Sequence, residues 1–144
     1  MDASVFLAFS IPEETEHADA ARFFAFCEAE SHDLLFPALA MVEVAGGVAR
    51  RKRDSEKAAV AVSRMTRLAG VQFFPLTFES AESAGKLARR HFLRGADAVY
   101  CQLARDKKAP LITYDMEIGE RAQGVINVAS PSAWIARTLL KTEH

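Results

Sequence analysis

The 144-residue chain lacks most of the features that would place it in a well-marked class of protein. No apolar run approaches the roughly 20 residues that a membrane-spanning helix needs, and no secretory signal opens the chain. We therefore expect a soluble, cytoplasmic protein. Only two cysteines occur, Cys27 and Cys101, far apart and without metal-ligand neighbours. This usage favours two buried, reduced thiols over a disulfide.

Several catalytic signatures are missing as well. The chain has neither glycine-rich phosphate-binding motif, no G-x-S-x-G nucleophile elbow, and no H-E-x-x-H or other histidine ligand spacing. The sequence therefore gives no support for nucleotide binding by a phosphate loop, for a serine nucleophile of the hydrolase kind or for a zinc ion held by histidines. The residues left to carry chemistry are carboxylates in apolar surroundings.

A net charge of one sign is also missing, because the formal total is -1. The distribution is nevertheless uneven: the first 49 residues hold nine acids and one arginine, whereas residues 50–67 are strongly basic. A second basic stretch runs from Lys86 to Lys108. A near-neutral total can therefore hide a basic face suited to a polyanion.

The pattern of apolar residues predicts one α/β domain over residues 1–144, long enough to bury a core. Short apolar runs that alternate with helical periodicity indicate a parallel sheet covered on both faces. Ligands of such sheets bind beyond the carboxyl ends of the strands. We expect helices over 13–30, 37–51, 55–69, 79–93, 97–107 and from 131, and strands over 34–36, 71–76, 110–114 and 125–128.

Glu43 is the most informative single residue, because it is the only charge between Pro37 and Ala49. A helix that is apolar on every side is expected to be buried, and a lone buried carboxylate costs several kcal/mol unless it is paired. Glu43 therefore faces either a narrow stripe of solvent or a site where a metal or a distant arginine is its partner.

Three more acids stand at the ends of predicted elements. Asp115 ends the strand P-L-I-T-Y-D, Asp97 begins a helix, and Asp2 precedes the apolar run 3–9. Taken singly, they could be a turn residue, a helix N-cap and a solvated terminus. Clustered carboxylates repel one another unless a cation neutralises them. Together with Glu43 they predict a site for a hard cation such as Mg²⁺, which binds phosphate and activates water.

Four segments together resemble the PIN-domain family, and most closely its VapC-type toxins of bacteria and archaea. The resemblance spans nearly the whole chain in order and spacing. It implies a three-layer α/β/α sandwich with a central, mostly parallel sheet, and an endoribonuclease that depends on Mg²⁺ or Mn²⁺. The segments are M-D-A-S-V-F-L-A-F, V-E-V within the apolar helix, L-R-G-A-D-A-V-Y-C-Q-L-A and P-L-I-T-Y-D.

The same resemblance implies roles for individual residues. The acidic quartet, which would hold the metal and act in catalysis, is Asp2, Glu43, Asp97 and Asp115. Two hydroxyls, on Ser4 and Thr113, would orient carboxylates, and Glu117 would be a further acid around the site. Ordinary polarity at a strand edge is the alternative for the hydroxyls, and a solvated helix start is the alternative for Glu117.

An RNA substrate and protein partners follow from the resemblance. Arginines of the basic stretches would contact phosphates, although each is explained equally well by a solvated helix face. The toxin reading implies a small antitoxin that blocks the site, and a homodimer. Exposed rings on the first helices would suit such an interface, although core packing also explains them. The arginines are Arg50, Arg51, Arg53, Arg90 and Arg94, and the rings are Phe23, Phe24 and Phe26.

Two other functions stay open. One is a PIN-like module without activity that binds RNA or protein. The other is a phosphate-handling switch of the receiver kind, which needs paired acids after its first strand and a lysine near the end of a later one. Where the receiver kind has paired acids, the chain has D-A-S. Where the lysine would be expected, Pro131 follows Ser130.

One departure from the family concerns the start of the sequence. Family members usually carry a short β-branched strand before the first aspartate, whereas here Met1 stands directly before Asp2. Either residues 3–7 form most of the first strand, or the native strand is missing. The free α-amino group would then lie beside the metal site and compete for Asp2.

Overall fold

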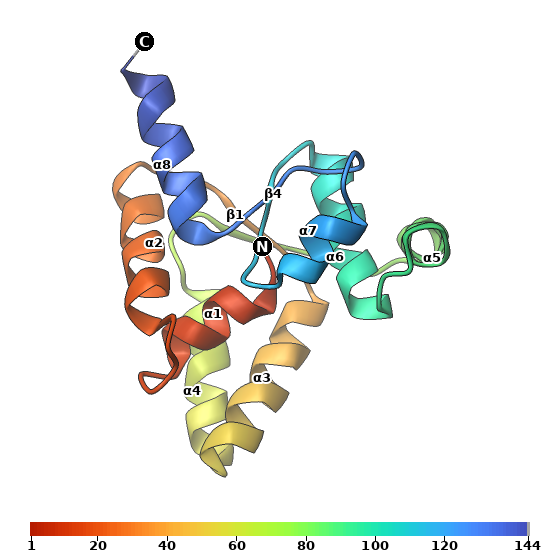
Figure 1. The fold of residues 1–144 in the computed structure, drawn as a ribbon. Coiled ribbons are helices and arrows are strands. Elements are labelled where there is room, and N and C mark those ends of the chain that lie inside the picture. Colours follow the sequence, from red (N-terminus) through yellow and green to blue (C-terminus); the bar gives the residue numbers. More distant parts are fainter. Residues whose placement is uncertain (144) are drawn as a thin grey trace.

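The computed structural model describes residues 1–143, and these residues form a mixed α/β fold (Figure 1). The predicted helices and strands are present, most within a few residues of the expected bounds, and a short helix follows Asp115, as the alternative for Glu117 had it. The order is α1 (Ala3–Ser10), α2 (His17–Ala29), β1 (Leu34–Pro37), α3 (Leu39–Lys52), α4 (Ser55–Thr66), β2 (Val71–Phe74), α5 (Phe78–His91), α6 (Gly95–Lys107), β3 (Leu111–Ile112), α7 (Met116–Arg121), β4 (Val128–Ala129) and α8 (Pro131–Thr142).

The parallel strands are confirmed, but the expected single sheet is not. Within residues 1–143 the strands form two separate pairs, which we call the half-sheets: β1 with β2, and β3 with β4. The start of the chain lies between them. The Met1 amino group donates to the carbonyl oxygen of Leu35 at 2.6 Å, and the Asp2 amide donates to that of Ile112 at 3.0 Å. Met1 and Asp2 therefore bridge the half-sheets.

Of the two alternatives for the start of the chain, the one in which residues 3–7 form most of the first strand is wrong, because this run belongs to the helix α1. A continuous apolar run does not by itself separate a buried strand from a buried helix. The helix fully buries Val5 and Phe6, and the Phe6 ring packs edge-on against Phe24 of α2, with ring centroids 5.7 Å apart. The aromatic residues of α1 and α2 thus favour a helical turn directly after Asp2.

The rings expected at an interface are mostly in the core. Phe23 and Phe24 are buried, which contradicts the idea that they are exposed, and Phe26 is partly buried. Phe26 packs against Trp134 of α8 with ring centroids 5.9 Å apart, as does Phe23 at 5.6 Å. These aromatic contacts attach α8 to α2.

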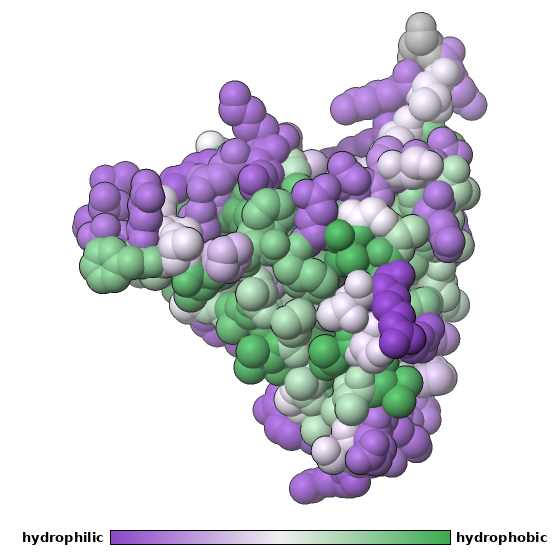
Figure 2. Space-filling model, turned by 180° about the vertical axis from the view of Figure 1, so that it is seen from behind, coloured by the Kyte–Doolittle hydropathy of each residue, from purple (hydrophilic) through white to green (hydrophobic). Residues whose placement is uncertain are grey.

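Apolar surface is found elsewhere. Figure 2 shows a broad apolar area on the rear face, between the corner formed by α5 and the side formed by α2 and α8.

Every helix within residues 1–143 is too short or too polar to span a lipid bilayer. Both cysteines are buried and free, as expected, and burial raises the pKa of each thiol to about 12.

Candidate acidic site

Asp2 is held in place by two hydroxyl groups. Its side chain is only 8% exposed, and its Oδ2 atom accepts hydrogen bonds from Ser4 Oγ at 2.8 Å and Thr113 Oγ1 at 2.7 Å. Ser4 lies in the first turn of α1, and Thr113 follows β3 and is fully buried. Because both hydroxyls donate to the same oxygen, the orientation of the carboxylate is fixed and Oδ1 is left for another ligand.

The same two hydroxyls also organise the end of β3. Thr113 Oγ1 accepts a hydrogen bond from the amide of Asp115 at 3.0 Å, and Ser4 Oγ accepts one from the amide of Tyr114 at 3.3 Å. The Asp115 side chain in turn caps α7, where its Oδ1 accepts from the amide of Glu117 at 3.0 Å. Asp115 is therefore the turn and cap residue that its position suggested. Its amide donates to the Thr113 hydroxyl, which in turn orients Asp2.

Glu43 has a partner that the sequence did not predict. Tyr100 of α6 is almost completely buried, and its hydroxyl donates to Glu43 Oε1 at 2.6 Å. Burial raises the pKa of Glu43, the Tyr100 hydrogen bond opposes this, and the charge of Asp2 adds to the rise. The expectation that α3 is buried on every side is wrong, because Val42 is 68% exposed. Glu43 itself is partly buried, at the border between core and solvent.

Asp97 is the third residue of α6, and Arg94 occupies the N-cap position that we considered for Asp97. Burial raises the pKa of Asp97 from 3.8 to about 6; Asp2 adds to the rise, Arg94 opposes it, and Asp115 and Glu43 contribute further. The three other members of the quartet therefore all act on the pKa of Asp97. Four segments far apart in the sequence place their acids in one electrostatic environment.

Arginines border this acidic cluster. Arg94 Nε lies 3.8 Å from Asp97 Oδ2, and Arg94 Nη2 lies 3.5 Å from Glu117 Oε2. Glu117 is also paired with Arg121, whose Nη2 lies 2.8 Å from Glu117 Oε1. Glu117 is thus connected to the cluster through Arg94. Arg121 was missed, although its spacing of four residues from Glu117 on a helix is a recognisable signal for such a pair.

Within residues 1–143, the remaining predicted arginines form no ion pair with the acids of the cluster. Arg50 is seven residues beyond Glu43 on the same helix, a distance of about 10 Å along its axis. Its side chain donates to the carbonyl oxygen of Gly46, and Arg51 pairs with Glu14 at 3.3 Å. Arg53 follows α3 and Arg90 lies near the end of α5. Of the five predicted arginines, only Arg94 forms an ion pair with an acid of the cluster within residues 1–143.

The composition of the cluster suits a hard cation, although the side chains are not arranged around one. Within residues 1–143, no group of three acids, histidines or cysteines is positioned to hold a metal ion. The available donors are carboxylate oxygens, which Mg²⁺ and Mn²⁺ prefer. Burial and, after it, the charges of Asp2, Asp115 and Glu43 raise the pKa of Asp97, while Arg94 opposes the rise. A divalent cation among these acids would offset their mutual repulsion.

The fold and this cluster define a PIN domain. A family model described as PIN domain matches residues 1–123, and the chain belongs to that family, as its motifs predicted. No curated protein was matched by sequence. The match leaves the receiver-type alternative without support.

Among solved structures, the chain is similar to the VapC20 toxin of Mycobacterium tuberculosis, described as a toxin that cleaves the sarcin–ricin loop. The TM-score is 0.71, with 18% sequence identity, and the match covers 83% of this chain and 91% of the toxin. At this identity the comparison shows that the folds are alike.

Proposed function

We propose that the protein is a divalent-metal-dependent endoribonuclease that hydrolyses RNA phosphodiester bonds, and that it is the toxin of a toxin–antitoxin pair. One observation carries the proposal: three acids from separate segments, Asp2, Glu43 and Asp115, raise the pKa of Asp97, and two hydroxyls orient one of them, Asp2. Membership of the PIN-domain family and the likeness to VapC20 support it.

The quartet of Asp2, Glu43, Asp97 and Asp115 would hold Mg²⁺ or Mn²⁺. When bound, such an ion polarises the phosphate and lowers the pKa of water. The chain's own residues position the ligands for this role. Ser4 and Thr113 hold Asp2 through Oδ2, and Tyr100 holds Glu43 through Oε1. In each acid the other oxygen remains available, so orientation and coordination use different atoms.

Arg94 is the arginine best placed to bind RNA at the scissile phosphate. Its side chain is 75% exposed and bridges Asp97 and Glu117. A cation bound among the acids would weaken the attraction of Asp97 for this guanidinium, which would then be free to bind a phosphate oxygen. Arg50, Arg51, Arg53 and Arg90 would extend the contact along the RNA backbone.

The partner proposal rests on the toxin likeness and on exposed apolar surface. A small antitoxin that covers the acidic site, and a second copy of the chain, are the expected partners. The exposed large side chains include Val42, Phe78, Phe92 and Leu140. They replace the aromatic residues of α2 as candidates, since Phe23 and Phe24 are buried.

The test combines calorimetric titration of Mn²⁺ with RNA cleavage, for the wild type and Asp97→Asn. The substrates are a hairpin with the sarcin–ricin loop and unrelated hairpins of equal length. Asp106→Asn is the matched control, because Asp106 lies on the same helix and pairs with Arg105, outside the acidic cluster. We expect binding and cleavage to disappear together in Asp97→Asn and to persist in the control. Retained cleavage by Asp97→Asn would contradict the assignment.

The inactive binding module remains the second candidate, and the absence of a preformed three-ligand group within residues 1–143 favours it. It predicts RNA affinity without Mn²⁺ binding. Filter binding of the same hairpins, with and without Mn²⁺, separates the two functions.

A further inference from the structure

Phe92 is an exposed aromatic residue in a basic segment next to the acidic site. Its side chain is 78% exposed, and it directly follows the last turn of α5, which holds Arg89 and Arg90. Both arginines are exposed, and within residues 1–143 neither forms an ion pair. Arg94 stands two residues after Phe92 and pairs with Asp97. Guanidinium groups therefore flank the exposed ring on both sides in the sequence.

Neither packing nor backbone preference explains a phenylalanine at position 92. Phe92 ends α5 in the left-handed conformation, with a φ of 55°, which favours glycine or asparagine and is strained for a bulky side chain. Within residues 1–143, the other non-glycine residues with positive φ are all polar, namely Ser31, Arg53 and Lys108. A residue that strains the backbone and leaves an apolar ring in water is a candidate for contact with a ligand.

A chain of contacts connects the backbone of Phe92 to the acidic site. Its carbonyl oxygen accepts a hydrogen bond from Arg121 Nη1 at 2.9 Å, and Nη2 of the same guanidinium lies 2.8 Å from Glu117 Oε1. Glu117 also contacts Arg94 at 3.5 Å, and Arg94 in turn lies 3.8 Å from Asp97. These contacts hold the end of α5 at the border of the acidic cluster.

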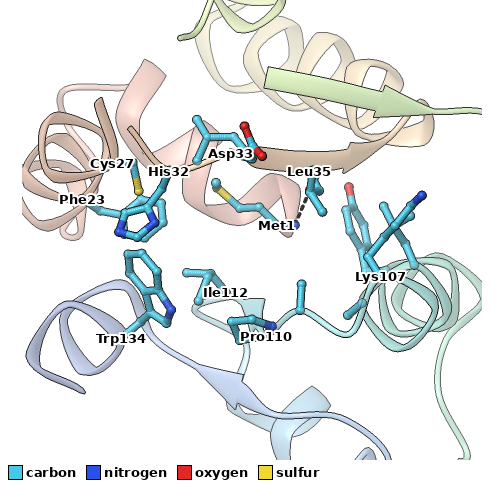
Figure 3. A pocket seen from close by; sticks show the side chains of 15 residues that line it. Met1, Phe23, Cys27, His32, Asp33, Leu35, Lys107, Pro110, Ile112 and Trp134 are labelled. Carbon is cyan, nitrogen blue, oxygen red and sulfur yellow. Dashed lines mark hydrogen bonds between the residues drawn. The ribbon is translucent and has the colours of Figure 1, made fainter. Parts of the chain in front are cut away.

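The rings of the pocket beside Met1 offer no comparable open face. This pocket has a volume of about 230 Å³, and two of the rings that line it, Phe23 and Trp134, pack edge-on against each other with centroids 5.6 Å apart (Figure 3). Lys107, which also lines it, places its amine 4.2 Å from the centroid of the Phe74 ring. These groups are engaged with one another, whereas the Phe92 ring is free to contact a ligand.

We propose that Phe92 is a stacking platform for an unpaired RNA base beside the phosphate bound at the acidic site, an inference that rests on the proposed RNA substrate. An exposed aromatic ring binds the face of a base, and arginines on both sides bind the phosphates that flank it. Phe92 is also among the candidates for protein contact named above. RNA is favoured because an apolar partner would have to cover the neighbouring guanidinium groups without pairing them.

The test measures the affinity of an RNA hairpin with an unpaired loop by filter binding in EDTA. A series of hairpins lacks one loop base at a time, through abasic nucleotides. Phe92→Leu keeps an apolar side chain but removes the flat ring, and Phe92→Trp keeps a ring. Phe78→Leu is the matched control, because Phe78 is 83% exposed at the other end of the same helix, about 20 Å away.

We expect removal of one particular loop base to weaken binding to the wild type by about tenfold. The same removal should have no effect on binding to Phe92→Leu, whereas Phe92→Trp and Phe78→Leu should behave as the wild type does. An equal abasic penalty in the wild type and Phe92→Leu, or no measurable affinity for any hairpin, would overturn the proposal.

Sedimentation of the same variants tests the competing role in protein contact. Self-association that is lost in Phe92→Leu, together with unchanged RNA affinity, would overturn the proposal and assign Phe92 to a protein interface. Because no metal is present in the binding assay, a protein that binds RNA through Phe92 but never cleaves it would contradict only the proposed nuclease activity. The two proposals can therefore fail separately.

Discussion

Replacing Asp97 by asparagine should make the metal-free protein more stable, although it removes a residue that we place at the centre of the site. The Asp97 carboxylate is partly buried beside Asp2, Asp115 and Glu43, and its pKa is raised from 3.8 to about 6. A raised carboxyl pKa means that the native state prefers the protonated form. Its contribution to stability is therefore present below pH 3.8 and is lost as the pH rises through about 6.

At pH 7.5 the whole penalty is present. A rise from 3.8 to about 6 corresponds to ~3 kcal/mol of unfavourable free energy. An acid at the third position of α6 also gains from the helix dipole, and asparagine gives up about 0.5–1 kcal/mol of this. We therefore expect Asp97→Asn to increase the free energy of unfolding by about 2 kcal/mol in EDTA, which is ~6 °C in midpoint.

Divalent metal should reverse the order of stability, so that the wild type becomes more stable than Asp97→Asn. At a Mn²⁺ concentration 100 times the dissociation constant, the wild type gains about 2.7 kcal/mol, whereas a variant without the site gains nothing. Urea unfolding at pH 7.5, with EDTA or with Mn²⁺, measures both effects, and Asp106→Asn controls for loss of a charge. A destabilised Asp97→Asn protein in EDTA would refute the idea that burial and the neighbouring acids penalise the Asp97 carboxylate.

Three further predictions concern the groups around the acids. Tyr100→Phe keeps the packed ring but removes the hydroxyl donor to Glu43, so urea unfolding should show a loss of about 1–2 kcal/mol, and kcat should fall more than KM changes. Thr113→Val removes the donor to Asp2 within a buried site; calorimetry should show Mn²⁺ binding weakened by about 10–100-fold, and Thr113→Ser should restore it. Burial lowers the pKa of the Met1 amino group from 8.0 to about 5, so the native state binds fewer protons and this contribution to stability should rise from pH 5 to pH 8. Acetylation of the amino group should abolish that component of the pH profile, and an unchanged profile would contradict it.

Much of the fold could be predicted because local chemistry and tertiary packing agree. Ser130 and Pro131 mark the start of α8, and Ser130 Oγ accepts from the amide of Ala133 as a capping residue does. The run after Asp2 is different, because its helix depends on aromatic contacts with α2, which no local pattern reveals. The division into two half-sheets also depends on tertiary contacts, because Met1 and Asp2 lie between β1 and β3.

The acids of the candidate site could be found because charge is rare in apolar segments, as Glu43 illustrates. Their partners could not be found in this way. Tyr100 lies 57 residues from Glu43, and Thr113 lies 111 residues from Asp2. A tyrosine in a buried helix indicates only that its hydroxyl needs an acceptor, without saying which one. Arg51 was proposed for RNA, but its pairing with Glu14 joins two surface segments that no spacing rule connects.

The bridge formed by Met1 and Asp2 has a consequence for communication within the molecule. The same two residues tie the half-sheets together and supply a carboxylate of the candidate site. If the site binds a cation as proposed, the spacing of the half-sheets and the cation affinity should be coupled. Such coupling is reciprocal. A ligand that fixes Asp2 also restrains the contact between the half-sheets, and a change that loosens this contact lowers the affinity for the ligand by the same factor. Amide exchange along β1 and β3 should then report whether the acidic site is occupied.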